Sequence, residues 1–488
     1  MRHHFIFPIL AFAAAACGSP SPSSAPTTTP ASHVAGTTAA PAPAKPAKRS
    51  LEERIAELQK EALASHAAVD FVRAITRDVG ARLAGSANDA KAVAWAEQRL
   101  TAEGFTNVHR ERAMVSHWER GPATGAIVSK GKRTPLELLA LGRSGSTPKG
   151  GLDAQVVRVE SLEAAKALGR KELAGKVLFF DVPTARARDG SGYGHSAGAR
   201  YAGSQVAVER GAVAMVIRSI SPDPAVPHTG TTAHAGLPSV ALAGTSADAL
   251  RDALAADLKA KVHLDVTARM LPDVESANVV GEIRGSERPD EVVLLGAHLD
   301  SWDVGEGASD DGAGCAIVAE AARLTAKYAP RRTVRVVLFA SEELGDAPGA
   351  TTYAETHAAE LEKIIVAFEA DAGEGRAYAF RAAVRPEHAP SVARIVSFLA
   401  PLGVEHDSHV AGAGTDVSPL HDKGVPVFQL RQDMTKYFDI HHTKSDVFEH
   451  IDQEALTQAT AAYAVTAYAT AELDETLGRA PEGPKAHW

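Results

Sequence analysis

The chain has 488 residues, 45% of which are hydrophobic, and a formal net charge of −9. This length and composition allow a large buried core and favour two or more domains. The negative charge argues against a nucleic acid as partner, because phosphate binding requires a basic face. No internal apolar run of the sequence approaches the ~20 residues that are needed to span a bilayer.

Residues 1–16 have the pattern of an export signal peptide, in which Arg2 precedes an apolar run and small residues lie before Cys17. Cleavage directly before Cys17 resembles the processing of bacterial lipoproteins, in which that cysteine is lipidated; an ordinary secretory signal is the alternative. We favour the lipoprotein because a Ser/Pro/Thr-rich segment, residues 17–50, follows at once and is predicted to be a disordered tether. We therefore expect an exported cell-envelope protein, on the periplasmic or cell-surface side, that contacts the membrane only through its lipid anchor.

Helices are predicted between residues 51 and 110. The segments 51–64 and 90–105 carry apolar residues at three- and four-residue spacing, and the second ends near Gly104. From about residue 120 to 270 the pattern changes to short β-like runs separated by glycine, proline and two helical segments. These runs lie at 123–129, 152–159, 176–182, 213–219, 237–243 and 261–268. No catalytic cluster is evident there, and we interpret this stretch as a second domain.

A strand–loop–helix pattern repeats from residue 276 onward. Strands are predicted at 291–297, 333–340 and 363–370, and helices at 313–328 and 350–361. Continuous Val/Ile/Leu runs indicate strands that are covered on both faces, hence an α/β sandwich with a largely parallel sheet. Cys315 falls within the first helical pattern as a small buried residue, and an intramolecular disulfide in the mature chain is not expected.

Each of these three strands leads directly into acidic residues or a histidine. The first strand is followed by His298, the second by Glu342 and Glu343, and the third by Asp371. The carboxyl ends of strands in an open α/β sheet are where binding sites are expected. Asp310 opens the helix after the first strand, and His441 and His442 lie near the C-terminus.

Histidine and carboxylate ligands without cysteine suit zinc, with cobalt and manganese as alternatives. The number of ligands predicts two ions per chain. His298 and Asp371 would hold one, Glu343 and one of the adjacent histidines the other, and Asp310 would bridge them. Three ligand carboxylates and one bridging hydroxide cancel the charge of two divalent cations, which explains why so many acids lie together.

The remaining acids of this cluster have separate predicted roles. Asp300 is placed to accept the other N–H of His298 and so to orient that ring. Asp311 is expected to brace the loop. Glu342 is left free to act as general base, taking the proton of a water and passing it to a leaving amine, so the chemistry is hydrolytic. A Glu-Glu pair is more often a solvated helix start, but not after a buried strand beside three other candidate ligands.

Four motifs carry a family resemblance: GAHLDSWDVGEGASDDGAG at 296–314, FASEELG at 339–345, FEADAG at 368–373 and HHTKSD at 441–446. They resemble the co-catalytic dizinc exopeptidases, the family of bacterial leucyl aminopeptidase. Three further segments are similar to its carboxypeptidase Q subgroup, namely GARLAGS at 80–86, SHWERG at 116–121 and PHTG at 227–230. The resemblance extends in order over roughly residues 70 to 470.

This resemblance implies a three-layer α/β sandwich of the zinc exopeptidase type. Residues 51–120 and 272–474 would form the peptidase domain, residues 121–271 an inserted β-rich protease-associated domain, and residues 475–488 a C-terminal tail. It implies that Glu342 is the base, that segments near Tyr437 and Thr415–Asp416 lie close to substrate, and that the metal ligands are His298, Asp310, Glu343, Asp371 and His442. The choice of His442 over His441 rests on the family pattern His-Thr-x-x-Asp, here 442–446.

The sequence therefore predicts a metallo-exopeptidase with two zinc ions that cleaves short peptides or dipeptides through a metal-bridged hydroxide. The subgroup resemblance implies unblocked dipeptides and a homodimer, while aminopeptidase, carboxypeptidase or dipeptidase preference stays open. One alternative is a non-catalytic receptor-like ectodomain on the same fold, which should lack the ligands found here. The other is an acyltransferase of the glutaminyl cyclase type, which would release a cyclised product.

Overall fold

The computed structural model describes residues 49–482, arranged around two eight-stranded sheets. The predicted signal peptide, Cys17 and most of the tether lie outside the described residues. We call residues 49–119 and 269–482, which contain the first sheet, the first lobe, and residues 120–268 the second lobe. Within the described part, no helix combines the length and the apolar character that a membrane crossing requires.

The first sheet is mixed. Its strands follow the order β1 (Thr106–Glu119), β10 (Arg269–Ile283), β12 (Arg332–Phe339), β11 (Arg288–His298), β13 (Ile364–Glu369), β16 (Val427–Gln432), β14 (Ala377–Ala383) and β15 (Glu405–His406). The four central strands, β12, β11, β13 and β16, are parallel to one another, whereas β1, β10 and β14 join through antiparallel pairs. The prediction of a largely parallel sheet is correct for the centre only. The flanking strands lack the continuous Val/Ile/Leu runs on which it rested.

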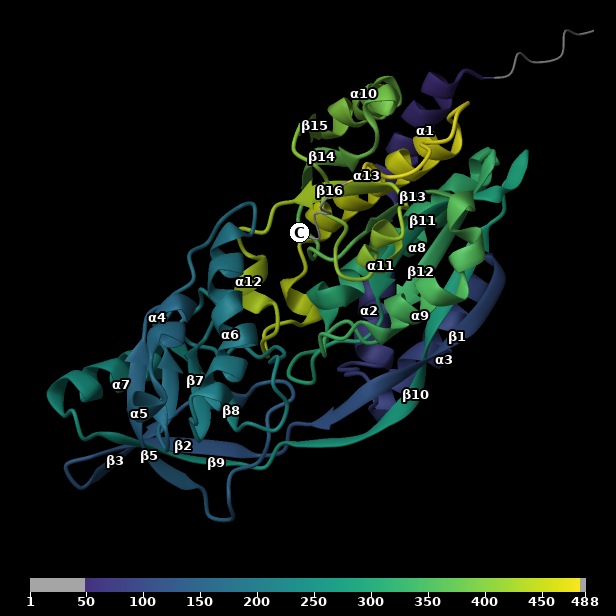
Figure 1. The fold of residues 1–488 in the computed structure, drawn as a ribbon. Coiled ribbons are helices and arrows are strands. Elements are labelled where there is room, and N and C mark those ends of the chain that lie inside the picture. The colour runs from purple at the N-terminus through teal and green to yellow at the C-terminus, as the bar shows by residue number, and fades with distance from the viewer. Residues whose placement is uncertain (1–48, 483–488) are drawn as a thin grey trace, which may run out of the picture. The chain divides into compact units, whose positions relative to one another are not determined.

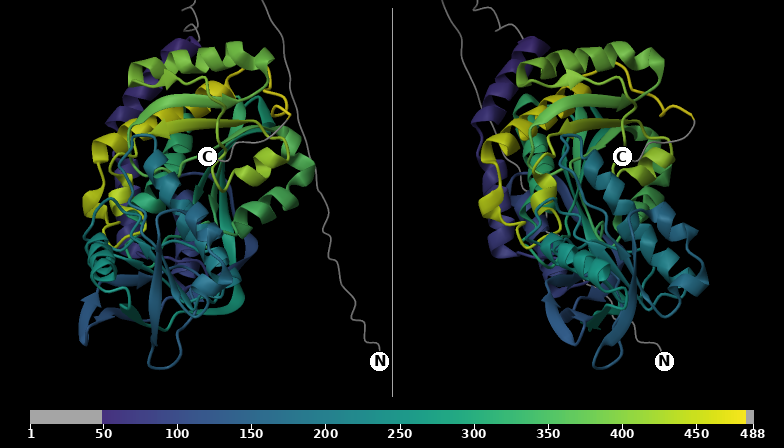
Figure 2. Two further views of the ribbon diagram at one scale, coloured as in Figure 1. Left: turned by 60° about the vertical axis from the view of Figure 1, so that its left-hand side comes forward. Right: turned by 90° about the vertical axis from the view of Figure 1, so that its left-hand side faces the viewer.

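Helices cover both faces of this sheet, as the three-layer prediction requires. In β11, Val293 and Leu295 pack into one core, and Val292 and Leu294 into another on the opposite face. The first core is covered by α1 (Leu51–Ala64), α2 (Ala67–Asp78), α3 (Ala87–Ala102), α8 (Gly314–Thr325), α10 (Ala389–Leu399) and α13 (Gln453–Ala471). The second is covered by α9 (Pro348–Thr356) and α11 (Ser418–Asp422). Figure 2 shows the purple and yellow helices on one side of the green strands and the green helices on the other.

Local sequence explains where the first helices begin and end. At the start of α1 the Ser50 hydroxyl accepts a hydrogen bond from the Glu53 amide, and the Glu53 carboxylate accepts one from the Ser50 amide. This reciprocal capping box satisfies two free amides at the N-terminus of the helix. Ser86 caps α3 in the same way through the Asp89 amide. The chain leaves α3 through Gly104 at φ +87°, a conformation that favours glycine.

The second sheet forms its own lobe, reached through the long β1–β10 ribbon (Figure 1). Its order is β3 (Lys132–Leu136), β2 (Ala123–Ser129), β9 (Lys261–Val266), β5 (Leu152–Val159), β6 (Val177–Phe180), β7 (Ala214–Arg218), β8 (Ser239–Leu242) and β4 (Leu138–Ala140). Its helices are α4 (Leu162–Ala167), α5 (Arg170–Leu173), α6 (Ser191–Glu209) and α7 (Gly244–Ala256). All six predicted β-like runs are confirmed as strands. Because β1 leads into this lobe and β10 leads out of it, the paired ribbon carries both connections.

Asp89 gives a test of this packing through pH. Its buried carboxylate accepts from the Gly85 amide at 2.9 Å and from the Ser276 hydroxyl of β10 at 3.0 Å. Burial raises the pKa of Asp89 from 3.8 to about 6. Between these values the folded protein retains a proton that the unfolded chain has lost, so stability falls as pH rises through this window.

We therefore expect Asp89→Asn, which cannot ionise, to raise the melting temperature by a few degrees at about pH 8. The gain should shrink below about pH 4, where both folded and unfolded parent are protonated. Thermal unfolding of both proteins across this range is the measurement. A variant less stable than the parent at the higher pH would show instead that the ionised carboxylate is well stabilised by its two donors.

Candidate metal centre

The carboxyl ends of three neighbouring parallel strands bring the predicted ligands together. His298 is the last residue of β11, Glu343 follows β12, and Asp371 follows β13. Asp310 comes from the loop before α8, and His442 follows the short helix α12 (Tyr437–Ile440). These five side chains meet at one edge of the first sheet.

The five side chains form two groups that share Asp310. In one, His298 Nε2 lies 3.2 Å from Asp310 Oδ1 and 3.6 Å from Asp371 Oδ1. In the other, His442 Nε2 lies 3.1 Å from Asp310 Oδ2 and 2.9 Å from Glu343 Oε2. The two carboxylate oxygens of Asp310 therefore face different groups, which is the arrangement of a bridging ligand.

Both groups fit a zinc ion. Ligand atoms about 2.0–2.2 Å from one tetrahedral zinc lie roughly 3.3–3.6 Å apart, close to the separations found here. All candidate ligand atoms within each group lie within 4.8 Å of one another. Asp310 Oδ2 and Glu343 Oε1 are buried without hydrogen-bond partners, and buried carboxylate oxygens are normally paired or bound to metal.

Burial and crowding shift the pKa values of these groups far from their usual ranges. Burial raises the pKa of Glu343 well above its usual range, and neighbouring acids add to the effect. For His298, burial lowers the pKa, but interactions with neighbouring acids, Asp300 first, outweigh it and raise the pKa well above normal. Such acids require a nearby positive charge to ionise together. A divalent cation would supply that charge.

Glu342 differs from its neighbour Glu343. It belongs to neither group of ligands, yet it lines the adjoining cavity. Burial is the largest cause that raises the pKa of Glu342, to about 7. A carboxyl group with a pKa near neutrality is suited to exchange protons during turnover.

Two further acids fix the backbone around the ligands. Asp300 accepts from the amides of Glu342 and Glu343 at 3.0 and 3.4 Å. His298 Nδ1 lies 3.1 Å from the Asp300 carbonyl oxygen but 3.6 Å from its carboxylate. The acceptor nearer to the imidazole is thus the backbone carbonyl of Asp300 rather than the predicted side chain. Asp311 accepts from the amides of His298 and Gly314, which confirms its bracing of the loop.

Two residues that the sequence reasoning left without a role hold the loop before Asp310. Arg82 is fully buried and donates to the carbonyl oxygens of Leu299, Glu306 and Gly307 at 2.6 to 2.9 Å. Asp446 accepts from the amides of Ser309 and Asp310 at 2.6 and 3.2 Å. The motifs at 80–86 and 442–446 contained both residues, but their contacts depend on loop geometry that spacing does not show.

Residues 120–270, in which the sequence shows no catalytic cluster, contribute one histidine to this region. The Nε2 atom of His228, from the second lobe, lies 3.2 Å from His441 Nδ1. Together with His442, these two residues form a third group of side chains that could hold a metal ion. The ring of His441 stacks on that of His442 at 3.6 Å, and its Nε2 lies 3.4 Å from Asp310 Oδ2. His228 could not be predicted as a site residue because it lies in a loop rather than at the end of a strand, although the motif at 227–230 contains it.

A cavity of about 570 Å³ opens beside the two groups. The first lobe supplies Glu342, Glu369, Tyr437 and most of the lining, and the second lobe supplies residues that include Tyr193 and Arg200. The cavity is therefore enclosed by both lobes. Tyr437 lines it, as the family resemblance implied, whereas Asp416 is fully buried behind Glu369, whose carboxylate accepts from its amide.

Comparison with known proteins identifies the family. A family model described as peptidase family M28 matches residues 278–467. Carboxypeptidase Q of Mus musculus is 35% identical over 408 residues, which cover 82% of this chain and 85% of that protein. The chain belongs to peptidase family M28. Carboxypeptidase Q of Homo sapiens is also similar, at 33% identity over 409 residues, 82% of this chain and 84% of that protein.

Solved structures of M28 type share the fold. The peptidase M28 precursor from Shewanella amazonensis SB2B matches with a TM-score of 0.86 at 40% identity. The match covers 88% of this chain and 99% of the chain of that structure. A zinc aminopeptidase from Bacillus subtilis has a TM-score of 0.61 at 20% identity, covering 82% and 94%, which is a similarity of fold alone. The resemblance inferred from the motifs is thus confirmed at the level of the family.

The shared position of Asp310 yields a stoichiometric prediction. We expect the purified protein to bind close to two zinc ions per chain, and Asp310→Asn to weaken both, because each group loses one charged oxygen. Elemental analysis after dialysis against limited zinc measures this. Asp290→Asn, which changes an exposed acid on the same strand as His298, is the matched control. Loss of a single ion from Asp310→Asn, with the other held at parental affinity, would contradict the bridging position.

Proposed function

We propose that this M28 peptidase is a zinc-dependent exopeptidase that hydrolyses the terminal bond of short peptides or dipeptides. The observation that carries the proposal is the position of Glu342, which lines the cavity next to two ligand groups that share one carboxylate. A cavity of about 570 Å³, enclosed by both lobes, suits a few residues rather than a folded protein segment.

Five side chains would hold the metal. His298 and Asp371 would bind one zinc, Glu343 and His442 the other, and Asp310 both. When bound, two zinc ions lower the pKa of a water and polarise the carbonyl of the bond to be cleaved. The carbonyl and carboxylate of Asp300 orient His298 and the Glu342–Glu343 backbone, so the ligands need little rearrangement to act.

Glu342 would be the general base. Its backbone amide donates to Asp300, and the residue lines the cavity beside the proposed ligands. The side chain takes the proton of the attacking water and returns it to the nitrogen of the leaving amine. Burial raises the pKa of Glu342, which favours holding the proton until it passes to the amine. The product is a free amino acid or a shortened peptide.

The paired glutamates provide the sharpest test. Glu342→Gln keeps the shape of the side chain but cannot accept a proton, so zinc content should persist while kcat falls by about 10²–10⁴-fold. Glu343→Gln removes a charged ligand, so it should lower zinc occupancy, and excess zinc should partly restore activity. Steady-state kinetics and elemental analysis on both variants measure these effects.

The opposite pattern, with zinc lost from Glu342→Gln and kept by Glu343→Gln, would reverse the two roles. The assay should quantify released amino acid with and without a chelator. A cyclised product in place of a released amino acid would favour an acyltransferase of the same fold and contradict the proposal.

We also propose that residues 121–271 act as a protease-associated domain and that the protein is exported and lipid-anchored at Cys17. Support for the anchor comes from the sequence of residues 1–50 alone. Cys17→Ser should therefore change processing and release the protein from the membrane fraction, which cell fractionation and mass spectrometry of the N-terminus would detect. Unchanged soluble secretion of parent and variant would support an ordinary signal peptide.

A further inference from the structure

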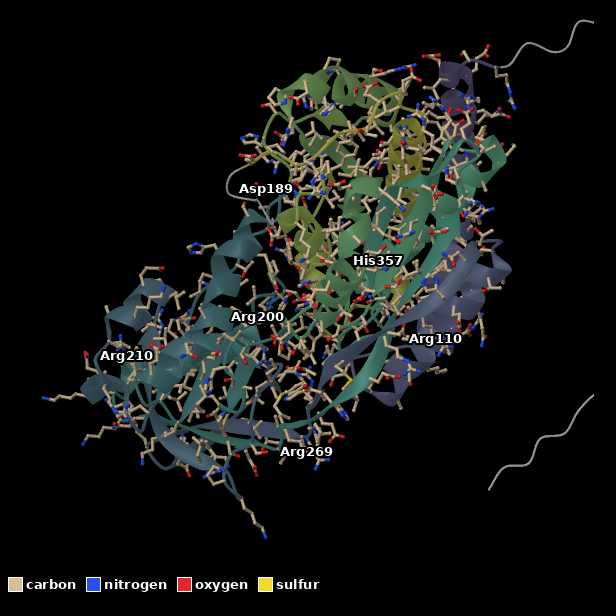
Figure 3. The ribbon with its side chains drawn as sticks, turned by 45° about the vertical axis from the view of Figure 1, so that its right-hand side comes forward. Arg110, Asp189, Arg200, Arg210, Arg269 and His357 are labelled. Carbon is tan, nitrogen blue, oxygen red and sulfur yellow. The ribbon has the colours of Figure 1, made fainter. Side chains whose placement is uncertain are left out.

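Residues 183–190, which we call the arm, connect strand β6 of the second lobe to helix α6. They form no helix or strand, and most of them are exposed. Figure 3 shows Asp189 of the arm beside the first lobe, and Arg210, at the opposite end of α6, on the outer part of the second lobe. The arm therefore reaches from the second lobe to the first.

Two ion pairs hold the arm against residues 431–439 of the first lobe. Arg186 pairs with Asp439 through two hydrogen bonds, 3.0 Å from Nε to Oδ2 and 2.7 Å from Nη2 to Oδ1. Arg188 Nε lies 3.2 Å from Asp433 Oδ2. About half of each arginine side chain is exposed, 49% and 57%, so dissolved salt screens both pairs.

Further contacts between the same segments support the ion pairs. The guanidinium carbon of Arg188 lies 3.8 Å from the centre of the Tyr378 ring, on strand β14. The Met434 amide donates to the Arg188 carbonyl oxygen at 3.0 Å, and Arg431 donates to the Asp189 carbonyl oxygen at 2.8 Å. The arm is thus attached to the first lobe at several points, most of them polar.

The arm closes the cavity on the side of residues 431–439. Asp189 and Gly190 line the cavity from the arm, and Met434 and Phe438 line it from the facing segment. A Cβ at Gly190 would lie 3.2 Å from Met434 Sδ and 3.3 Å from a ring carbon of Phe438, so the two segments are already in contact. Next to this contact, the Tyr193 ring stacks on the Phe438 ring at 4.1 Å. A peptide chain can pass between the segments only if the arm moves.

We propose that the arm, held closed by Arg186 and Arg188, determines the length of peptide that the protein cleaves. This rests on the proposed exopeptidase function. A dipeptide fits within the closed cavity and requires the arm to open only for entry and release. A longer peptide that extends past Gly190 requires the arm to stay open during cleavage, so its kcat/KM is reduced by the fraction of molecules in which the arm is open. An exposed ion pair shifts such an equilibrium by roughly two- to fivefold.

The rates for dialanine and tetra-alanine test this proposal, measured as initial loss of the intact peptide. We expect kcat/KM of the zinc-loaded parent to be at least about tenfold higher for dialanine. Arg186→Gln and Asp439→Asn should each raise the ratio of tetra-alanine to dialanine kcat/KM by about two- to fivefold. The double variant should raise it no further than either single variant, because all three lose the same ion pair.

Arg251→Gln is the matched control. It removes exposed ion pairs with Asp248 and Asp252 that lie within α7 of the second lobe and do not reach the first lobe. The ratio should stay at the parental value. Zinc content and circular dichroism establish that each variant is folded and loaded.

Salt gives a second readout. Raising sodium chloride from about 0.05 to 0.5 M should increase the ratio in the parent, because exposed ion pairs are screened. The ratio should change little in Asp433→Asn/Asp439→Asn, which has lost both pairs already.

Trypsin reports on the arm without substrate turnover. Asp433→Asn/Asp439→Asn keeps Arg186 and Arg188 as cleavage sites but frees both side chains, so trypsin should cut the arm faster than in the parent. Mass spectrometry of the fragments locates the cut. A ratio at the parental value in this folded variant overturns the proposal, whether or not the arm is cut faster. An equal rise of the ratio in Arg251→Gln also overturns it.

The proposed function fails in a distinguishable way. If the zinc-loaded parent hydrolyses neither dialanine nor longer peptides, the exopeptidase assignment is rejected and the role of the arm with it. If the parent hydrolyses tetra-alanine as fast as dialanine, the assignment stands and only the role of the arm is rejected.

Discussion

Burial of several acids at one edge of the first sheet is the constraint on which the rest of the structure depends. Asp310 has ligand atoms within 4.8 Å of those of Asp371 and of those of Glu343, and Glu342 lines the cavity beside them. An uncompensated buried charge costs on the order of several kcal/mol, and these groups repel one another as well. The histidines compensate only in part, because burial lowers the pKa of His442 and so favours its neutral form. A bound divalent cation would offset the repulsion among these acids, which otherwise destabilises the folded state.

The protein holds these acids in place chiefly through backbone groups. Asp300 and Asp446 each accept hydrogen bonds from two backbone amides at or next to a proposed ligand, and Asp311 accepts from the amides of His298 and Gly314. Arg82 does the converse, since it donates to three carbonyl oxygens of the loop that precedes Asp310. Loops rarely keep ligand geometry unaided, so this network lets a flexible connection act as a rigid part of the site.

The sequence was most informative where function coincides with regular structure. His298, Glu343 and Asp371 could be predicted as neighbours because each ends or follows a buried parallel strand, and such strands end at the same edge of a sheet. The antiparallel flanks were missed because β1 alternates exposed and buried residues and shares no apolar run with the centre. Strand order follows from contacts between segments far apart in sequence, which periodicity does not report.

Two of the residues that the sequence left without a role come from the second lobe. Arg200 lines the cavity from a helix of that lobe, and His228 contacts His441 from a loop; neither position shows a distinctive local spacing. Their contacts depend on how the lobe meets the segment after β16. The Thr229 amide donates to the His442 carbonyl at 2.9 Å, and the Tyr193 ring stacks on Phe438 at 4.1 Å. The second lobe therefore fixes the backbone of a proposed metal ligand and also encloses the cavity. The same segment, 227–230, thus contacts the backbone of His442 and leaves space for the guanidinium of Arg200, so one loop of the second lobe shapes both the proposed metal centre and the cavity.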